Sequence, residues 1–385
     1  MASRFCTESW IREGLPSFFP LPAVRICEWP DHWLRGAQLA GLADAPCKTT
    51  EKNAVANNLA IDNAGRESAE ARLANALVGF KLRDNAFRLL TQTAAWTVLI
   101  LLGGVIASLI VGSMPAIRAF GLNFLSTEAW NPVTEKFGAM APVYGTIVTS
   151  LIAMAIAVPV GLGIAIFLTE LCPYALRRPI GIAIELLAGI PSIIYGIWGL
   201  FVLAPFLQEH VQPGLISAFA NVPVLSGLFA GPPYGIGVLT AGVILAIMVL
   251  PIVSAISRDV FETVPAVLKE SAYAVGCTTW EVVRSVVIPY TSVGIIGGVM
   301  LGLGRALGET MAVTFVIGNA HRIAPSLLAP GTTISATIAN EFTEAVGDLY
   351  TSALIALGLI LFVITFFILA ISRYLLMRLH QREGL

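Results

Sequence analysis

The sequence predicts an all-α membrane protein with six transmembrane helices, and two observations carry this prediction. Hydrophobic residues make up 56% of the 385 positions and charged residues only 12%, with a mean hydropathy of +0.81. Soluble domains are about 45–50% apolar and about 25% charged. The apolar residues also gather into stretches long enough to cross a bilayer, where helices satisfy every backbone polar group internally.

Six apolar stretches are expected to span the bilayer. Each has about 20 residues or more, which matches a hydrocarbon core about 30 Å thick. Three of them contain a proline, at Pro159, Pro191 or Pro251, where the missing backbone N–H is expected to kink or break the helix. The expected spans are Leu89–Gly112, Pro142–Leu171, Ile180–Leu207, Tyr234–Ser257, Tyr290–Ile317 and Tyr350–Leu375.

The distribution of lysine and arginine predicts the orientation of these spans. With a cytoplasmic N-terminus, eleven basic residues lie on the cytoplasmic side, and only Arg118, Lys136 and Arg322 lie outside. Cytoplasmic loops carry an excess of lysine and arginine, so we expect both termini to be cytoplasmic. The eleven residues are Lys81, Arg83, Arg88, Arg177, Arg178, Arg258, Lys269, Arg284, Arg373, Arg378 and Arg382.

Four segments of different character follow one another along the chain. Residues 1–75 combine scattered prolines with a polar run, and we expect a cytoplasmic extension that is mostly disordered, with a short helix around Ala69–Phe80. Residues 76–141 hold the first transmembrane helix and a periplasmic loop. Residues 142–375 hold the other five helices, and residues 376–385 form a cytoplasmic tail. The cysteines and histidines lack metal-ligand spacing, so no metal site is expected.

The loop Thr263–Tyr290 is expected to form two short helices around a glycine turn. Thr263 can cap the first helix, which should stop at Gly276 in the left-handed conformation that glycine favours after a helix. Thr278 and Glu281 have the spacing of a capping box for the second helix.

An apolar stripe at helical spacing runs along the same loop, and it has two possible roles. It either packs on the protein's own spans or lies in a groove on a cytoplasmic partner. The stripe consists of Val264, Val267, Leu268 and Val275.

The loop resembles the signature of bacterial ABC-importer permeases, which has the form Glu-x-Ala-x3-Gly followed by Ile/Leu-Pro. The matching residues are Glu270, Ala272, Gly276, Ile288 and Pro289, with Ser271 where alanine is usual. The resemblance implies the type I ABC-importer permease fold, in which this loop forms a coupling helix that docks on a separate ATPase. Glu270, Ala272, Gly276 and Pro289 would then serve ATPase coupling.

Three further stretches narrow the resemblance to permeases of phosphate importers: "GIPSIIYGIWGL" (Gly189–Leu200), "LPIVSAISRDVFETVP" (Leu250–Pro265) and "GLGRALGETMAVTFVIGN" (Gly302–Asn319). The resemblance implies transport of inorganic phosphate across the bacterial inner (plasma) membrane. Its implied partners are the lipid bilayer, a second, PstA-like permease, a dimer of ATPase subunits and a periplasmic phosphate-binding protein. No nucleic-acid partner is expected.

Arg305 and Glu309 are charged residues inside an expected span, where a charge costs at least about 2.5–3.5 kcal/mol. Four residues apart, they would share one helical face and could pair. An arginine fork matches phosphate oxygens, so we expect the two to line the substrate pathway; the alternative is a pair that only fixes helix packing. Thr310 and Ser192 are weaker pathway candidates. Glu185 is expected to pair with a nearby arginine instead.

Other functions remain open at this point. The chain could be a permease for another oxyanion, such as sulfate or molybdate, or an autonomous ion-coupled carrier or channel. The coupling loop argues against the carrier, which needs no ATPase docking element. The sequence has no Walker-type phosphate loop, so we expect no ATP hydrolysis and no cofactor bound by this chain, with ATP used by the partner ATPase.

Overall fold

The computed structural model describes residues 50–223 and 225–382, and within these ranges the fold is all-helical, as expected. Apart from one isolated bridge between Asn131 and Lys136, the described ranges contain no β-pairing. The chain divides into two compact units, Met1–Thr93 and Ala94–Leu385.

The helices of the described residues include four π-helical turns, in which each N–H bonds five residues back. In chain order the elements are α1 (Thr50–Phe120), α2 (Asn123–Ser126), α3 (Met140–Ile166), η1 (Phe167–Leu171), α4 (Tyr174–Ala188), α5 (Ser192–Trp198), η2 (Gly199–Leu203), α6 (Ala204–Phe206), η3 (Leu207–Val211), α7 (Gln212–Phe219), α8 (Leu225–Leu228), α9 (Val238–Glu262), α10 (Ala266–Ala274), α11 (Thr279–Val282), η4 (Val283–Val287), α12 (Ile288–Gly308), α13 (Met311–Val316), α14 (Ile334–Glu341) and α15 (Asp348–Arg382).

Six helical segments among the described residues are long and apolar enough to cross a membrane, which confirms the expected number. Pro159 and Pro251 lie inside α3 and α9, both of which continue through the proline. Pro191 instead separates α4 from α5, so the third candidate segment begins at Ser192 and not at Ile180. The six segments are Arg83–Phe120, Met140–Leu171, Ser192–Phe219, Val238–Glu262, Thr279–Gly308 and Asp348–Arg378.

The described part of the first unit is the beginning of α1. Residues 50–75, which we expected to be mostly disordered, are helical, while residues 1–49 lie outside the described ranges. The signal is visible in the sequence, because residues 50–80 include eight alanines, the residue type that most favours a helix, and contain no proline. At the other terminus, α15 extends to Arg382, through most of the segment expected to be a tail.

α9 forms the centre of the second unit, and it is the most buried of the six candidate spans. It packs between α3 and α12, and glycines on the neighbouring helices permit the close approach. On α12 these glycines are four residues apart and face large aliphatic side chains of α9. The opposed pairs are Gly294 with Val260, Gly298 with Ile256, and Gly302 with Val249.

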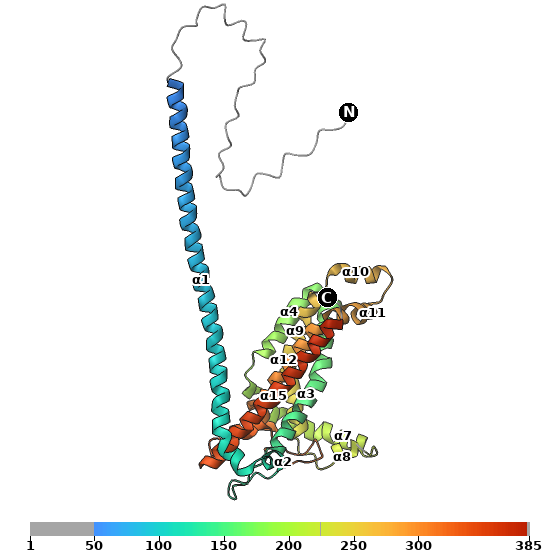
Figure 1. The fold of residues 1–385 in the computed structure, drawn as a ribbon. Helices are drawn as coiled ribbons and strands as arrows, with labels where there is room; N and C mark the ends of the chain where they lie inside the picture. The colour runs from blue at the N-terminus through green and yellow to red at the C-terminus, as the bar shows by residue number, and fades with distance from the viewer. Residues whose placement is uncertain (1–49, 224, 383–385) are drawn as a thin grey trace, which may run out of the picture. The chain divides into compact units, whose positions relative to one another are not determined.

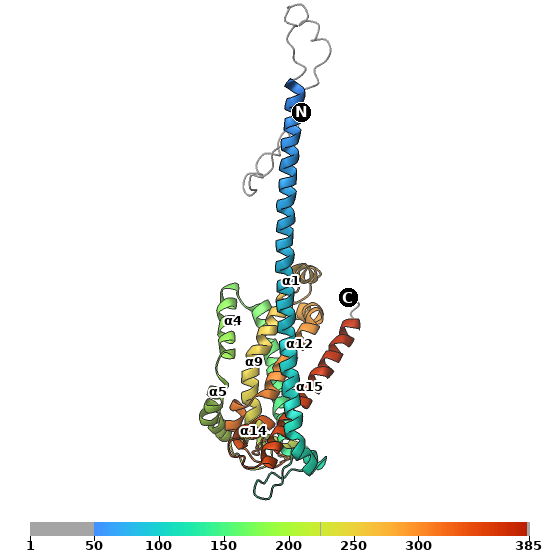
Figure 2. The same cartoon turned by 60° about the vertical axis from the view of Figure 1, so that its left-hand side comes forward.

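The second unit has two ends with different structures (Figures 1 and 2). α10 and α11 lie at one end, together with the last turns of α15; we call this the α10 end. α2, α7, α8 and α14 lie at the opposite end, which we call the α14 end. There an aromatic and aliphatic cluster, including Phe124, Phe137, Ile334 and Tyr350, joins α2, α14 and α15.

We predict that Gly145→Ala destabilises the protein. A Cβ at Gly145 would lie 1.8 Å from the backbone oxygen of Thr332, and a main-chain atom cannot move aside as a side chain can. The adjacent Ile334 N–H donates to Thr146 Oγ1 at 2.9 Å, which ties the same loop to α3. Overpacking of this kind costs about 1–3 kcal/mol or more. The thermal midpoint of the purified protein should fall accordingly.

The matched control is Gly163→Ala, on the same helix. No atom outside the local helix backbone lies within 4 Å of a Cβ at Gly163, so this variant should be neutral or slightly stabilised. An equal loss of stability in both variants would contradict the proposed clash.

Candidate functional site

Arg305 and Glu309 lie on either side of a break between two helices. α12 ends at Gly308, and Glu309 has extended dihedral angles (φ −71°, ψ 130°) before α13 begins at Met311. Among the ion pairs of the described residues, none joins these two side chains. The prediction that they pair on one helical face is therefore wrong, because a spacing of four residues aligns side chains only within an unbroken helix.

Each of the two charged side chains is stabilised by the end of the helix nearest to it. Arg305 lies in the last turn of α12, where the helix dipole favours a cation. The Oε1 atom of Glu309 accepts a hydrogen bond of 3.4 Å from the N–H of Ala312, in the first turn of α13. An acidic acceptor is favourable there because the first N–H groups of a helix lack partners within the helix.

Arg305 lies at mid-depth of the helix bundle of the second unit, on a face that the described residues of this unit leave uncovered. Gly302, one turn earlier, lies against Val249 and Val253, near the middle of α9. Arg305 is exposed, whereas the neighbouring Ala306 is buried in the core. The guanidinium is therefore accessible from outside the described part of this unit.

Ser192 and Thr310 lie at the beginnings of two helices that pack together. A Cβ at Gly196 of α5 would be 3.1 Å from Ala312 Cα of α13, and a Cβ at Gly199 would be 3.2 Å from a methyl of Val316. The two helices therefore run in the same direction, with their N-terminal ends on the same side. Both hydroxyl residues are half-buried, next to the break that holds Glu309.

The predicted turn between the two loop helices is confirmed. Gly276 has φ +98°, and the N–H groups of Gly276 and Cys277 donate to the carbonyls of Tyr273 and Ala272, at 2.9 and 3.2 Å. This pattern closes the C-terminal end of α10 as a Schellman motif. The capping box of Thr278 and its partner three residues later is also present.

The first helix of the loop begins later than expected. Pro265, not Thr263, occupies the N-cap of α10. Thr263 instead caps the end of α9, where its hydroxyl donates to the backbone oxygen of Val260 at 2.7 Å.

The apolar stripe of the loop is divided between two surfaces. Val264 is buried against the bundle, but Val267, Leu268 and Val275 are exposed, as are Tyr273 and Trp280. Packing on the protein's own spans therefore accounts for only one of the four stripe residues. Of the predicted coupling residues, Glu270, Gly276 and Pro289 are exposed and Ala272 is half-buried.

Ion pairs tie the α10 end together. Arg258 of α9 pairs with Glu185 of α4 at 2.6 Å, which confirms the expected pairing of Glu185 with an arginine. Sequence reasoning missed a second pair, between Lys269 of α10 and Glu170 of η1 at 2.5 Å. The only signal in the sequence was an acidic residue at the end of an apolar span.

An aromatic and polar cluster lies at the α14 end and was also missed. The ring of His321 stacks on Trp130 with 5.4 Å between centroids, and its Nε2 lies 3.4 Å from Oε1 of Glu341. The hydroxyl of Tyr350 donates to the other oxygen of Glu341. These residues come from three distant parts of the sequence, which is why no local pattern indicated the cluster.

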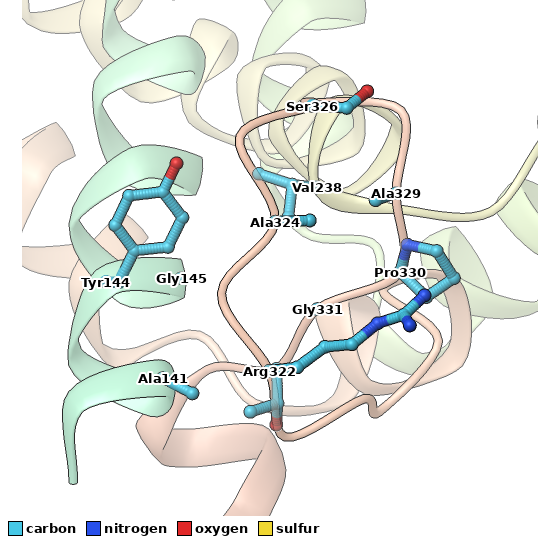
Figure 3. A pocket seen from close by; sticks show the side chains of 11 residues that line it. Ala141, Tyr144, Gly145, Val238, Arg322, Ala324, Ser326, Ala329, Pro330 and Gly331 are labelled. Atoms are coloured by element: carbon cyan, nitrogen blue, oxygen red, sulfur yellow. The ribbon is translucent and has the colours of Figure 1, made fainter. Parts of the chain in front are cut away.

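A small, shallow hollow opens beside this cluster, between the first turns of α3 and α9 and the loop 322–332. Arg322 is the single charged residue among its lining residues, and Figure 3 shows its side chain reaching across toward Pro330. The hollow contains none of the residues predicted to serve transport, so it is separate from the helix break at Arg305.

One known protein family matches more than half of the chain. The family described as "Binding-protein-dependent transport system inner membrane component" matches residues 157–381. Among solved structures, the bacterial alginate ABC transporter in complex with its alginate-bound periplasmic protein covers 75% of this chain and 92% of its own, with a TM-score of 0.51 and 17% identity. This likeness supports the fold alone.

Curated relatives are similar over most of their length. "Phosphate transport system permease protein PstC" of Mesorhizobium japonicum is 73% identical over 305 residues, which cover 79% of this chain and 93% of the relative. "Probable phosphate transport system permease protein PstC" of Methanocaldococcus jannaschii is 40% identical over 298 residues, with 76% and 93% covered.

We predict that the protein loses stability as the pH falls through the ordinary range of histidine, about 6.5. Burial lowers the pKa of His321, and the nearby carboxylate of Glu341 offsets this only in part. The unfolded chain therefore takes up a proton at a higher pH than the folded chain does, which favours unfolding below about pH 6.5. His321→Gln cannot take up this proton. Thermal midpoints between pH 7.5 and 5.5 should fall less in this variant, and equal slopes would contradict the prediction.

Proposed function

Since this chain belongs to the family of binding-protein-dependent transport system inner membrane components, we propose that it is one permease subunit of an ATP-driven importer of inorganic phosphate. As a multi-pass protein of the inner membrane, it would form half of the translocation pathway. A second, PstA-like permease would form the other half. A dimer of ATPase subunits and a periplasmic phosphate-binding protein would complete the importer.

One observation carries the choice of substrate: the 73% identity with a permease named for phosphate transport, over 93% of that relative's length. The more distant relative from Methanocaldococcus jannaschii is also named for phosphate transport. Sulfate or molybdate transport, and autonomous ion-coupled transport, have no comparable support. The geometry adds an arginine at mid-depth, and a guanidinium fork matches the oxygens of a phosphate group.

The exposed loop α10–α11 supports coupling to a separate ATPase. Its outward surface carries exposed apolar and aromatic side chains among polar ones, as expected for a helix that lies in a groove on another protein. In this proposal Glu270, Ala272, Gly276 and Pro289 serve coupling, the α10 end is cytoplasmic, and both termini are on that side. ATP is bound by the partner and no cofactor by this chain.

Arg305, Glu309, Thr310 and Ser192 would line the phosphate path. Arg305 is available for this role because it is exposed and the chain supplies no acidic partner for it among the described residues. Glu309, Thr310 and Ser192 lie at the ends of the short helices beside it. Negative charge on Glu309 would limit how tightly the site holds an anion, which keeps binding transient.

The decisive experiment reconstitutes the complete importer in liposomes and measures uptake of labelled phosphate. Uptake should require ATP and the binding protein, persist without an ion gradient, and resist competition by sulfate and molybdate. Uptake by this chain alone, driven by an ion gradient, would contradict the proposal. Competition by another oxyanion at equal concentration would contradict the assignment of phosphate.

We predict that Arg305→Ala assembles normally but loses phosphate uptake, because the exposed side chain contributes little packing and its fork is the proposed anion ligand. Arg305→Lys should also transport poorly, since an ammonium retains the charge but not the bidentate geometry. The matched control is Arg118→Ala, because Arg118 is likewise exposed and in the last turn of a helix. Normal uptake by Arg305→Ala in an assembled complex would remove this residue from the path.

Glu309→Gln should assemble, because a glutamine oxygen can still accept the hydrogen bond from the Ala312 N–H. Its turnover should change, because the negative charge that limits anion binding is lost. Since Arg305 and Glu309 are not in contact, their effects on the free energy of unfolding should add within about 0.5 kcal/mol. Strong non-additivity of the double variant would instead indicate direct pairing.

We predict that Gly276→Val uncouples ATP hydrolysis from uptake. Space around Gly276 is open, so the effect comes from the backbone, whose φ of +98° is strained for a β-branched residue. Gly276→Asn should retain more phosphate transported per ATP, because asparagine tolerates left-handed conformations better. Equal coupling in both variants would show that the glycine turn is not required.

A further inference from the structure

The ion pair between Lys269 and Glu170 is the most buried one among the described residues. The Nζ and Oε1 atoms are 2.5 Å apart, and the side chain of Glu170 is only 7% exposed. The two residues are 99 positions apart and belong to α10 and to η1. Burial of two charges consumes much of the energy that their attraction provides, so such a pair is a weak source of stability. The pair matters more for the position in which it holds α10 relative to η1.

α10 has little else to hold it to the bundle. None of its residues is buried, and Ala272 is its one member in the apolar cluster beneath the loop. Lys269, three residues earlier, lies on the same side of the helix and is half-buried. The ion pair is therefore the polar attachment of α10 to the transmembrane helices.

Beyond Glu170, polar contacts continue into the bundle. Glu170 lies in the π-helical turn η1, which directly follows α3. The backbone oxygen of the preceding residue, Thr169, accepts a hydrogen bond from Arg177 of α4. α4 is also held to α9 by the Arg258–Glu185 pair. A displacement of Glu170 thus acts on α3 and α4 together.

α4 leads directly to the proposed phosphate path. It ends at Ala188, and after Pro191 the chain continues as α5, which begins with Ser192. α5 packs against α13, the helix that follows the break at Glu309. The contacts therefore run from α10 through Lys269 and Glu170 to the helices that border the path.

We propose that the Lys269–Glu170 ion pair is the strut that transmits movement of α10 to α3 and α4 when the ATPase closes. This inference rests on the proposed function, because it assumes that α10 docks on the ATPase. Both residues act as positioning residues, without contact to phosphate or ATP. Loss of the pair should leave α10 bound to the ATPase while its movement no longer reaches the path.

The test uses the complete importer in liposomes, with Glu170→Gln and Lys269→Met as single variants. Three quantities are measured: the amount of assembled complex, the ATPase rate with and without loaded binding protein, and phosphate transported per ATP. We expect normal assembly, sustained ATP hydrolysis, and a fall of at least about fivefold in phosphate per ATP, which is typical of a lost coupling between sites. The control, Glu262→Gln, removes an exposed carboxylate near the loop and should match wild type.

The charge-swapped variant, Glu170→Lys with Lys269→Glu, should recover part of the phosphate transported per ATP. Unchanged coupling in the assembled single variants would overturn the strut. If the single variants do not assemble, the apolar double variant Glu170→Leu with Lys269→Leu decides, since such pairs often replace buried ion pairs without loss of stability. Assembly with poor coupling would support the strut, while normal coupling, or failure to assemble, would overturn it.

Failure of the proposed function would look different. A wild-type importer that transports no phosphate on ATP hydrolysis would refute the function itself. The strut is judged only by the ratio of each variant to a wild type that transports.

Discussion

Close packing of α9 against α3 and α12 is the constraint on which the rest of the second unit depends. Glycines at positions 294, 298 and 302 let α12 approach the large side chains of α9, and Gly161 of α3 does the same at Val253. In lipid there is no hydrophobic force to hold helices together, so such close van der Waals contact is a main source of association. It fixes the rotation of α12 about its axis, and hence the face on which Arg305 emerges.

The features that depend on local sequence could be predicted. Long apolar runs indicated the six spans, because length and hydropathy alone decide which segments cross a bilayer. The turn at Gly276 and the capping box at Thr278 followed from residue types at fixed offsets, and both are present. Pairing of Glu185 with an arginine also followed, because an acid near the end of a span requires a cation within reach.

Features that depend on the three-dimensional path of the chain could not be predicted. The sequence spacing of Arg305 and Glu309 assumed a continuous helix, but α12 ends between them and α13 starts a new one. The break has no proline, and Gly308 at the end of α12 is one of several glycines along this stretch, so it did not single out the break. Likewise, Lys269 and Glu170 are brought together by packing of the loop on η1, and the Trp130–His321 stack joins segments with no shared periodicity.

Because Arg305 is exposed, its charge affects the stability of a single copy of the subunit in the membrane. A solitary copy in the bilayer holds a guanidinium against acyl chains at mid-depth, at a cost of at least about 2.5–3.5 kcal/mol. Association with a neighbouring protein that surrounds the guanidinium with water or polar groups removes this cost. The equilibrium constant for association then rises by roughly a hundredfold. A single copy of the subunit is therefore less stable in the bilayer than a copy whose Arg305 is covered by a neighbouring protein.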